Sequence, residues 1–421
     1  MKYYFPKRRV LGNKAVGGMA YRMLKTEFHA NGKAAAEELY QKRITSDSAL
    51  RWDFRIGEDP AFCVLTVDIV TRLEQIMSRE RRISSLWHEI PVGASRGYVQ
   101  TLLLREIEAT NGIEDIRSTR QEIDEALRAK RGDGGPYKRF RELARLYNGL
   151  AFEWLELPKN FADVREIYDA VTDGELEDGA EIEGPLFRAE TTNVMGGTKV
   201  IHKAVPAHEI EPRIQMMLEL LHEKETSGLI TAVVTHFMFE YVHPFYDGNG
   251  RTGRFLLAQK LQRVLSLPTA IALSPTINEY KSRYYKAFET AENPLNRAEL
   301  TGFVNDMLAL IATAQAEMLQ DLIARKYLFD GLKRRIENLP SGSKKEQRRA
   351  QILFLLGQVW LFDDTRVIAQ DDVLPYFSES PRTLRKDIAH LEDEGLVQAV
   401  SQRPLRYTLT KKACSELDLT R

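Results

Sequence analysis

Residues 243–254, HPFYDGNGRTGR, place a base, an acid and two cations within one short segment of the chain. His243 can take up a proton near neutral pH, and Asp247 can bind a hard cation such as Mg²⁺ through its oxygens. Arg251 and Arg254 lie close to one helical turn apart and carry fork-shaped donors that match phosphate oxygens. These residue types predict a site for a phosphate compound together with a metal ion.

The glycines of this segment favour one kind of phosphate site over another. Gly248, Gly250 and Gly253 formally match the G-x-G-x-x-G fingerprint of dinucleotide sites, which requires a strand before it. Residues 227–242 instead have the apolar spacing of a helix, which argues against a Rossmann site. A glycine-rich turn that opens a helix still presents backbone N–H groups to an anion. Because Asp247 would repel a bare phosphate, we expect Mg²⁺ between them, and a nucleotide is the simplest ligand.

His243 is placed to act as the base of such a site. It lies four residues before Asp247 at the end of the predicted helix, and Pro244 helps to end that helix. A neutral imidazole there could accept a proton from a hydroxyl group that attacks the bound phosphate. His236, on nearly the same helix face, also allows a two-histidine metal site. No third ligand has suitable spacing, so we favour a core or hydrogen-bonding role for His236.

The composition indicates a multidomain protein without a strong overall charge. The chain has 421 residues, enough for two or three domains, and its 60 basic and 60 acidic residues cancel. No overall field therefore attracts nucleic acid or an anionic membrane. Cys63 and Cys414 are too few for a disulfide framework or a four-cysteine zinc site. With no apolar run of about 20 residues, we expect a cytoplasmic protein with no membrane partner.

Apolar residues recur at helical spacing through most of the first 330 residues, which predicts a mostly helical domain. The clearest exception is NVMGGTKVIHKAV, where Gly196 and Gly197 can supply the positive φ of a hairpin turn. Residues 338–349 combine Pro, Gly, Ser and a basic run, which predicts a linker. Three helices and a strand pair are expected beyond it, in the order of a winged helix. Besides the two helices flanking the motif, helices are expected at residues 98–127, 207–223, 281–292 and 298–328.

The segment 243–254 matches the signature of the Fic family, H-P-F-x-[D/N]-G-N-G-R-x-x-R, at every fixed position. The resemblance extends to the flanking segments and covers roughly residues 160–310. Most Fic proteins transfer AMP from ATP to a hydroxyl side chain of a target protein. By this resemblance, His243 would activate the target hydroxyl and Asp247 would bind Mg²⁺. The same resemblance assigns ATP binding to Gly248, Asn249, Gly250, Arg251 and Arg254.

The resemblance also concerns the walls of the site. Tyr284 and Tyr285 resemble the tyrosine pair beside the family's adenine pocket, although tyrosines on a helix also serve as core residues. Glu292 falls where relatives tend to have asparagine. The hairpin around Gly196 and Gly197 is similar to the flap that binds the target segment as an added strand and reads little of its sequence. A surface hairpin without that role would have the same sequence pattern.

A further match lies upstream, in residues 110–115, TNGIED. The family's built-in inhibitor is a helix with the pattern [S/T]-x-x-x-E-[G/N], which Thr110 and Glu114 fit, whereas Asp115 departs from it. By analogy, Glu114 would pair with Arg254 and displace the γ-phosphate of ATP, as a carboxylate can compete for a guanidinium. In some relatives the same glutamate positions water to remove AMP, so a reverse reaction stays open.

The C-terminal segment SPRTLRKDIAHLEDEGLV resembles the recognition helix of bacterial winged-helix domains. Ser380 could cap that helix, while Arg382, Arg385 and Lys386 could contact phosphates. Residues 350–421, however, contain nine Lys or Arg against eleven Asp or Glu. A net acidic domain binds DNA poorly unless one face concentrates its cations. DNA is thus a conceivable partner, but we favour protein docking or a spacer role.

Together these features predict a mainly α protein, with a Fic-type helical domain, a small β-hairpin flap and a C-terminal winged-helix domain. The expected function is that of an Mg²⁺- and ATP-dependent protein adenylyltransferase, self-inhibited by Glu114. Its target would offer a Tyr, Thr or Ser hydroxyl and could be a second copy of the chain. Still open are a homodimer, transfer of phosphate or another nucleotide, and a transcription regulator whose Fic domain only senses nucleotide. The expected parts are an N-terminal extension of unknown role (1–70), a helical region (71–158) with the inhibitory helix (98–127), the catalytic domain (159–337), the linker (338–349) and the winged helix (350–421).

Overall fold

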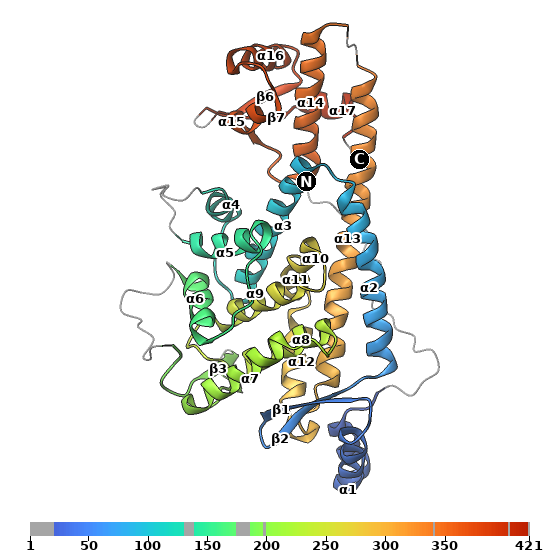
Figure 1. Ribbon diagram of the computed structural model, residues 1–421, viewed down its shortest axis with the longest axis vertical. Coiled ribbons are helices and arrows are strands. Elements are labelled where there is room, and N and C mark those ends of the chain that lie inside the picture. The colour runs from blue at the N-terminus through green and yellow to red at the C-terminus, as the bar shows by residue number, and fades with distance from the viewer. Residues whose placement is uncertain are drawn as a thin grey trace.

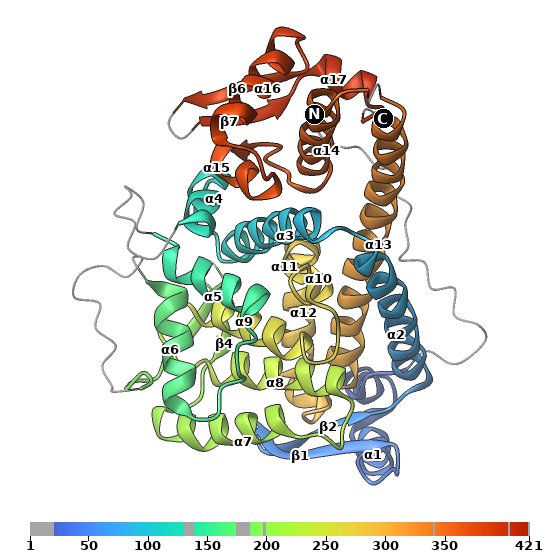
Figure 2. The ribbon, with the colours of Figure 1, turned by 45° about the horizontal axis from the view of Figure 1, so that its top comes forward.

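The computed structural model describes residues 21–129, 139–173, 186–196, 199–339, 342–402 and 405–419. Figure 1 shows an elongated, mainly helical molecule in which the long helix α13 (Thr301–Glu337) runs from the helical body toward the C-terminal region. The helix α2 (Val67–His88) packs along α13, and Figure 2 shows this pair from a second side. Several other helices of the body also pack against α13.

The N-terminal segment, which the sequence left without a role, is part of this body. The amide of Leu300 donates to the carbonyl of Phe62 over 2.7 Å, and the amide of Phe62 donates to the carbonyl of Ala298 over 3.3 Å. These bonds join an antiparallel strand pair to the chain just before α13. The elements of this segment are α1 (Leu24–Ile44), β1 (Ala49–Ile56) and β2 (Asp59–Val64).

The motif lies in the turn between α8 (Gly228–Val242) and α9 (Asn249–Leu261), as its sequence predicted. Because α8 is apolar on nearly every side, it is buried in the core, and neighbouring helices pack around it. The elements around it are α5 (Arg141–Phe152), α6 (Phe161–Thr172), η1 (Ala207–Glu209), α7 (Ile210–His222), α10 (Leu267–Ala270), α11 (Leu273–Glu279), α12 (Lys281–Ala291) and η2 (Pro294–Asn296).

The single helix expected at residues 98–127 is wrong, because the chain forms two helices there. The first, α3 (Val92–Ile113), ends where Asp115 takes a left-handed backbone conformation with φ of 57°. The second, α4 (Arg120–Arg128), starts with a capping box between Thr119 and Glu122. The apolar periodicity continues across the break, which explains why the pattern suggested one helix. Glu114 is therefore the residue that ends α3.

The C-terminal region begins earlier than the sequence suggested. Ser343 and Glu346 form a capping box that starts α14 (Lys344–Phe362), so the second half of the predicted linker is helical. Antiparallel strands form a sheet in the order β5-β7-β6. This order of elements is the one on which the winged-helix prediction depends, and that assignment stays a prediction. The elements after α14 are β5 (Ile368–Ala369), α15 (Gln370–Val373), η3 (Leu374–Tyr376), α16 (Pro381–Asp393), β6 (Val397–Gln402), β7 (Leu405–Leu409) and α17 (Lys411–Glu416).

Two further features bear on the sequence predictions. The strands β3 (Asn193–Gly196) and β4 (Lys199–Lys203) pair as an antiparallel hairpin, whose Gly197 lies outside the described residues. The helix α13 contains an apolar window that is long enough to cross a membrane, which the sequence analysis did not identify. Since 61% of that window is buried within this fold, core packing accounts for its apolar residues.

Candidate functional site

His243 ends α8 in a left-handed conformation with φ of 51°, and its amide donates to the carbonyl of Phe239 over 3.0 Å. This turn directs the chain away from α8 and carries the rest of the motif. Burial, followed by the charges of His202 and Arg188, lowers the pKa of His243 to about 3. The imidazole is therefore neutral near pH 7 and can accept a proton.

Arg188 holds the backbone around His243 in place. Its side chain is almost fully buried. Its Nε donates to the carbonyl of His243 over 2.8 Å, and its Nη2 donates to the carbonyls of Val242 (3.2 Å) and Val205 (2.5 Å). Its amide also donates to the carbonyl of Pro244 over 3.0 Å. The sequence analysis missed Arg188, because an arginine within the short apolar segment PLFRAE carries no spacing signal.

The glycine-rich turn starts α9 with Gly248, whose φ is 74°. A Cβ atom at this position would lie 2.5 Å from Cγ2 of Thr172, so glycine is required on steric grounds as well. The side chain of Asn249 is occupied within the turn: it accepts from the amide of Phe245 (3.0 Å) and donates to its carbonyl (2.7 Å). Asn249 thus shapes the turn and leaves anion binding to backbone N–H groups. Asp247 is exposed, and its Oδ1 accepts from the amide of Gly248 over 2.7 Å.

Arg254 makes the ion pair with Glu114 that the sequence predicted, with 2.7 Å between Nη2 and Oε1. Its Nε donates to the hydroxyl of Thr110 (2.8 Å), and its Nη2 donates to the carbonyl of the same residue (3.1 Å). The Arg254 side chain is 2% exposed and that of Glu114 is 31% exposed. A Cβ atom at Gly250 would overlap the Glu114 carboxylate. The end of α3 therefore covers the first turn of α9, where an anion would bind.

The two arginines of the motif point to different helices. Arg251 is buried, and its Nη1 donates to the carbonyl of Val171 at the end of α6 over 3.4 Å. Arg254 points to α3, as described above. The sequence predicted that both would face one phosphate, whereas here each is engaged by a different neighbouring helix.

His236 has the hydrogen-bonding role that we favoured from the sequence. Its Nδ1 lies 3.1 Å from the carbonyl of Gly253 and its Nε2 lies 2.8 Å from the hydroxyl of Tyr284. Because the carbonyl can only accept, Nδ1 carries the hydrogen and Nε2 accepts from the tyrosine. Burial lowers the pKa of His236 to about 3. Both ring nitrogens of His236 are thus engaged by protein groups.

The two tyrosines predicted at the adenine pocket have different environments. Tyr284 is buried and joined to His236, so it belongs to the core. The Tyr285 side chain is exposed at 37%, and its hydroxyl donates to the carbonyl of Ile113 over 3.4 Å. Tyr285 thus contacts the end of α3 next to Glu114, whereas Tyr284 supports it from behind with ring centroids 5.4 Å apart.

Glu240 is a buried acid of the site that the sequence analysis missed. Its carboxylate packs on Gly253, where a Cβ atom would overlap it, and its Oε1 has no hydrogen-bond partner in the described structure. Burial raises the pKa of Glu240 to about 8, and the charge of Glu114 adds to this effect while that of Arg254 opposes it. Arg254 therefore lies in the field of two carboxyl groups, one from α3 and one from α8.

The same helix that ends at Glu114 is anchored along its length. Glu106, one turn before Thr110, is buried and accepts from the amide (2.9 Å) and hydroxyl (2.5 Å) of Ser274 in α11. Glu106, Thr110 and Glu114 follow one another at intervals of four residues and so form one stripe of α3 that faces α9 and α11. This stripe fixes the rotation of α3 on the body.

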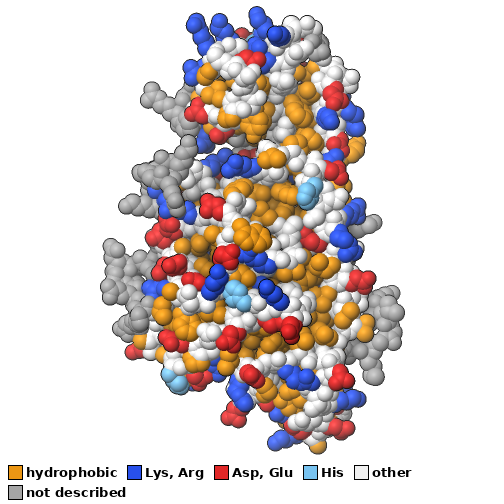
Figure 3. Space-filling model, viewed as in Figure 1, with side chains coloured by type: hydrophobic (Ala, Val, Ile, Leu, Met, Phe, Trp, Pro, Cys, Tyr) orange, Lys and Arg blue, Asp and Glu red, His pale blue; other side chains and the backbone are white. Residues whose placement is uncertain are grey.

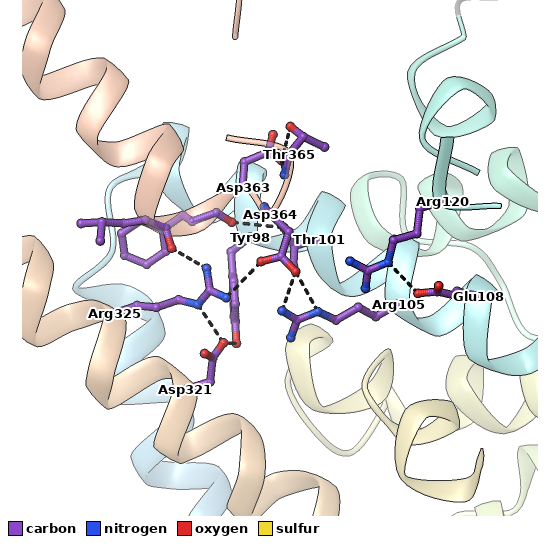
Figure 4. Close-up of polar contacts among 12 residues, drawn as sticks. Tyr98, Thr101, Arg105, Glu108, Arg120, Asp321, Arg325, Asp363, Asp364 and Thr365 are labelled. Carbon is purple, nitrogen blue, oxygen red and sulfur yellow. Dashed lines mark hydrogen bonds and ion pairs between the residues drawn. The ribbon is translucent and has the colours of Figure 1, made fainter. Parts of the chain in front are cut away.

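The first half of α3 is held by the C-terminal region, as Figure 4 shows. Asp364 follows α14 and binds Nη2 of Arg105 over 2.5 Å and Nη2 of Arg325 over 3.3 Å. Its amide donates to the hydroxyl of Thr101 over 2.8 Å. Tyr98 donates to Asp321, which also pairs with Arg325, and both of these bonds measure 2.8 Å. This network joins α3, α13 and the C-terminal region at one point.

Exposed cations gather at the far end of the C-terminal region (Figure 3). Lys344 and Lys345 begin α14, and Arg382 and Lys386 lie on α16, which packs against α14. The region thus concentrates some of its cations on one end, and counted from Lys344 it has 13 Lys or Arg against 12 Asp or Glu, so it is not net acidic once α14 is included. DNA binding by this end stays a prediction.

Comparisons with known proteins bear on the domain that carries the motif at residues 243–254. Residues 158–261 match the family model described as Fic/DOC family. The crystal structure of a Fic family protein from Desulfovibrio desulfuricans G20 is similar in fold, with a TM-score of 0.51 and 20% sequence identity, over 83% of this chain and 97% of that chain. A Fic domain containing signaling protein from Bacteroides thetaiotaomicron VPI-5482 matches with a TM-score of 0.43 and 15% identity, over 58% of this chain and 97% of that chain. Fic-1 from C. elegans matches with a TM-score of 0.43 and 18% identity, over 72% of this chain and 79% of that chain.

Proposed function

Because residues 158–261 form a Fic/DOC domain, a family whose members often transfer AMP to proteins, we propose that this protein is a protein adenylyltransferase. It would transfer AMP from ATP to a Tyr, Thr or Ser hydroxyl of a target protein. One observation carries the proposal: a neutral imidazole, His243, ends α8 within the same loop that opens α9 with a glycine-rich turn. Base and anion turn are thereby held on one rigid segment.

The proposed chemistry follows from these positions. The target hydroxyl oxygen forms a bond to the α-phosphorus of ATP, its proton passes to His243, and the bond to pyrophosphate breaks. The backbone N–H groups at the start of α9 and the guanidinium of Arg254 would hold the phosphates. The protein contributes mainly positioning and charge stabilisation, the usual sources of catalysis in phosphoryl-type transfer.

The motif offers one residue for the expected Mg²⁺. Asp247 is exposed beside the anion turn, and its carboxylate is engaged only by the neighbouring amide of Gly248 among the bonds described. A single carboxylate fits Mg²⁺, which usually keeps water and phosphate oxygens as its other ligands. When bound, the ion would neutralise charge on the phosphates.

We further propose that the described conformation is self-inhibited. Glu114 pairs with Arg254 and lies over Gly250, so its carboxylate takes the place that a phosphate of ATP would need. Release of Glu114 would free both the guanidinium and the first turn of α9. The reverse reaction, removal of AMP, would use the same residues.

Labelling with α-labelled ATP and Mg²⁺ tests both proposals. We expect Glu114→Ala to label protein in a host lysate more strongly than wild type, and Glu114→Ala combined with His243→Ala to label nothing. Glu108→Ala is the matched control, because this exposed acid of α3 pairs with Arg120 and does not contact Arg254. Labelling by the His243→Ala double variant would refute the mechanism, and equal labelling by Glu114→Ala and Glu108→Ala would refute inhibition. Mass spectrometry of the product distinguishes AMP from phosphate or another nucleotide.

A further inference from the structure

Two side chains, one before β3 and one in β4, bind the carbonyl groups at the end of α8. Arg188, before β3, binds the carbonyls of Val242 and His243. His202, in β4, places its Nε2 2.9 Å from the carbonyl of Tyr241. The last carbonyls of a helix have no partners within it, and here the flap segment supplies them. The position of the flap and the end of the helix that carries His243 are therefore set by one network.

His202 has a second partner on another helix. Its Nδ1 lies 2.7 Å from Oε2 of Glu292, which caps the end of α12, and the two side chains are 11% and 18% exposed. The carbonyl of Tyr241 and an ionised Glu292 can both only accept. A neutral imidazole has one N–H group, so with Glu292 ionised both bonds form together when His202 is the imidazolium and Glu292 its counter-ion.

We propose that His202 is a positioning residue, which fixes the flap hairpin to the end of α8 as an imidazolium paired with Glu292. This proposal rests on the proposed function in one respect: it takes His243 as the base that the hairpin faces. The rings of His202 and His243 have centroids 6.2 Å apart, so His202 acts through the backbone that it binds. The positive charge of His202 also disfavours protonation of His243, as the base requires.

This pairing accounts for Glu292, where the Fic resemblance would place an asparagine. A neutral asparagine amide could accept one hydrogen bond from the imidazole, but it could not balance its charge. Glutamate at this position thus matches the histidine at position 202. Glu292 thus helps to hold the hairpin, and at the end of α12 beside β4 its side chain is only 18% exposed.

The charged surroundings of His202 are mixed. Besides Glu292, it faces Tyr241 and His243 at the end of α8, and the charge of Arg188 also acts on His243. Beyond the ring of Tyr241, Arg213 of α7 stacks at 5.8 Å and is itself paired with Glu209 over 2.6 Å.

Hydrogen exchange of the full chain tests the anchor without reference to activity. We expect His202→Gln to speed exchange of the amides in residues 193–196 and 199–203 by about tenfold or more, the effect of losing a charge-assisted hydrogen bond. His208→Gln, an exposed histidine close in sequence, should leave these amides unchanged.

A double-variant comparison isolates the ion pair. Glu292→Gln alone should speed flap exchange, and adding it to His202→Gln should have little further effect, since either change breaks the same pair. Additive effects of the two changes, or flap exchange in His202→Gln equal to that in wild type, would overturn the proposal. Labelling by the Glu114→Ala variant should also fall when His202→Gln is added. If no variant labels any protein, the proposed function fails while the exchange data still decide the role of His202.

Discussion

The two ends of α3 are held in different ways. The first half is bound to the C-terminal region and to α13 through Asp364, which serves two arginines and whose amide binds Thr101. The other end reaches the motif through Thr110 and Glu114, and the glutamate, 31% exposed, stands where the helix stops. A partly exposed ion pair at a helix end opens more easily than a network shared by three elements. The helix is thus anchored along its first half, and the proposed inhibition depends on release of its other end.

The largest effect should follow from removing the arginine at the releasable end. In the Glu114→Ala background, Arg254→Ala should reduce labelling by about 1000-fold, because the proposed phosphate donor is lost. Arg105→Ala in the same background removes an arginine from the anchored end and should leave labelling nearly unchanged. Initial rates with α-labelled ATP measure both. Similar losses in the two variants would mean that the ends of α3 do not differ in function.

The next effect should follow from breaking the anchored end. Asp364→Ala leaves Arg105 and Arg325 without their shared carboxylate and should lower the free energy of unfolding by about 2 kcal/mol, given that Asp364 is one quarter exposed. Asp330→Ala removes an exposed carboxylate that pairs only with Lys326 among the ion pairs described and should change stability by about 0.5 kcal/mol or less. Denaturant titrations compare the two. We also expect Asp364→Ala to label more than wild type and less than Glu114→Ala.

A smaller effect should appear as a pH dependence near Arg254. Burial raises the pKa of Glu240 to about 8 from a usual value of 4.5, so the folded protein keeps a proton that the unfolded chain has released. The stability from this proton is complete below about pH 4.5 and is lost as the pH rises through about 8. Glu240→Gln should therefore show a shallower fall in the free energy of unfolding over this range. An unchanged slope would show that Glu240 is ionised in the folded protein.

The smallest effect should come from the residue after Glu114. Asp115 has a φ of 57°, a conformation that glycine adopts more easily, and its side chain is exposed beside Lys281. Asp115→Gly should raise the free energy of unfolding by about 0.5 kcal/mol and lower residual labelling, since the end of α3 would be better held. Asp115→Ala loses the Lys281 contact and keeps the strain, so it should not stabilise. A stabilising Asp115→Ala would contradict this account.

The sequence predicted the parts of the site that depend on local pattern. The turn between α8 and α9, the pair of Arg254 with Glu114, and the hydrogen-bonding role of His236 could all be inferred from spacing or resemblance. The left-handed Asp115 also explains why Gly or Asn is usual there, since both tolerate this conformation. Patterns that repeat along a helix or match a known signature were therefore sufficient for these features.

The features that the sequence did not predict depend on contacts between distant segments. Arg188 and His202 bind carbonyl groups about 40 to 55 residues further along the chain, and no periodicity marks such partners. The break after α3 was missed because its apolar spacing continues through a change of direction. The place of the N-terminal strands in the body depends on the hydrogen bonds of Phe62 with Ala298 and Leu300, which are far from Phe62 in the sequence.

Gly250 has a consequence for how inhibition could be lost over evolution. Any side chain at this position would overlap the Glu114 carboxylate. Under the proposed function, it would equally fill the space needed by a phosphate at the start of α9. A substitution here could not release the inhibitor without also harming the substrate. If Glu114 inhibits as proposed, variants that escape inhibition are therefore expected on α3 or its anchors rather than at this glycine.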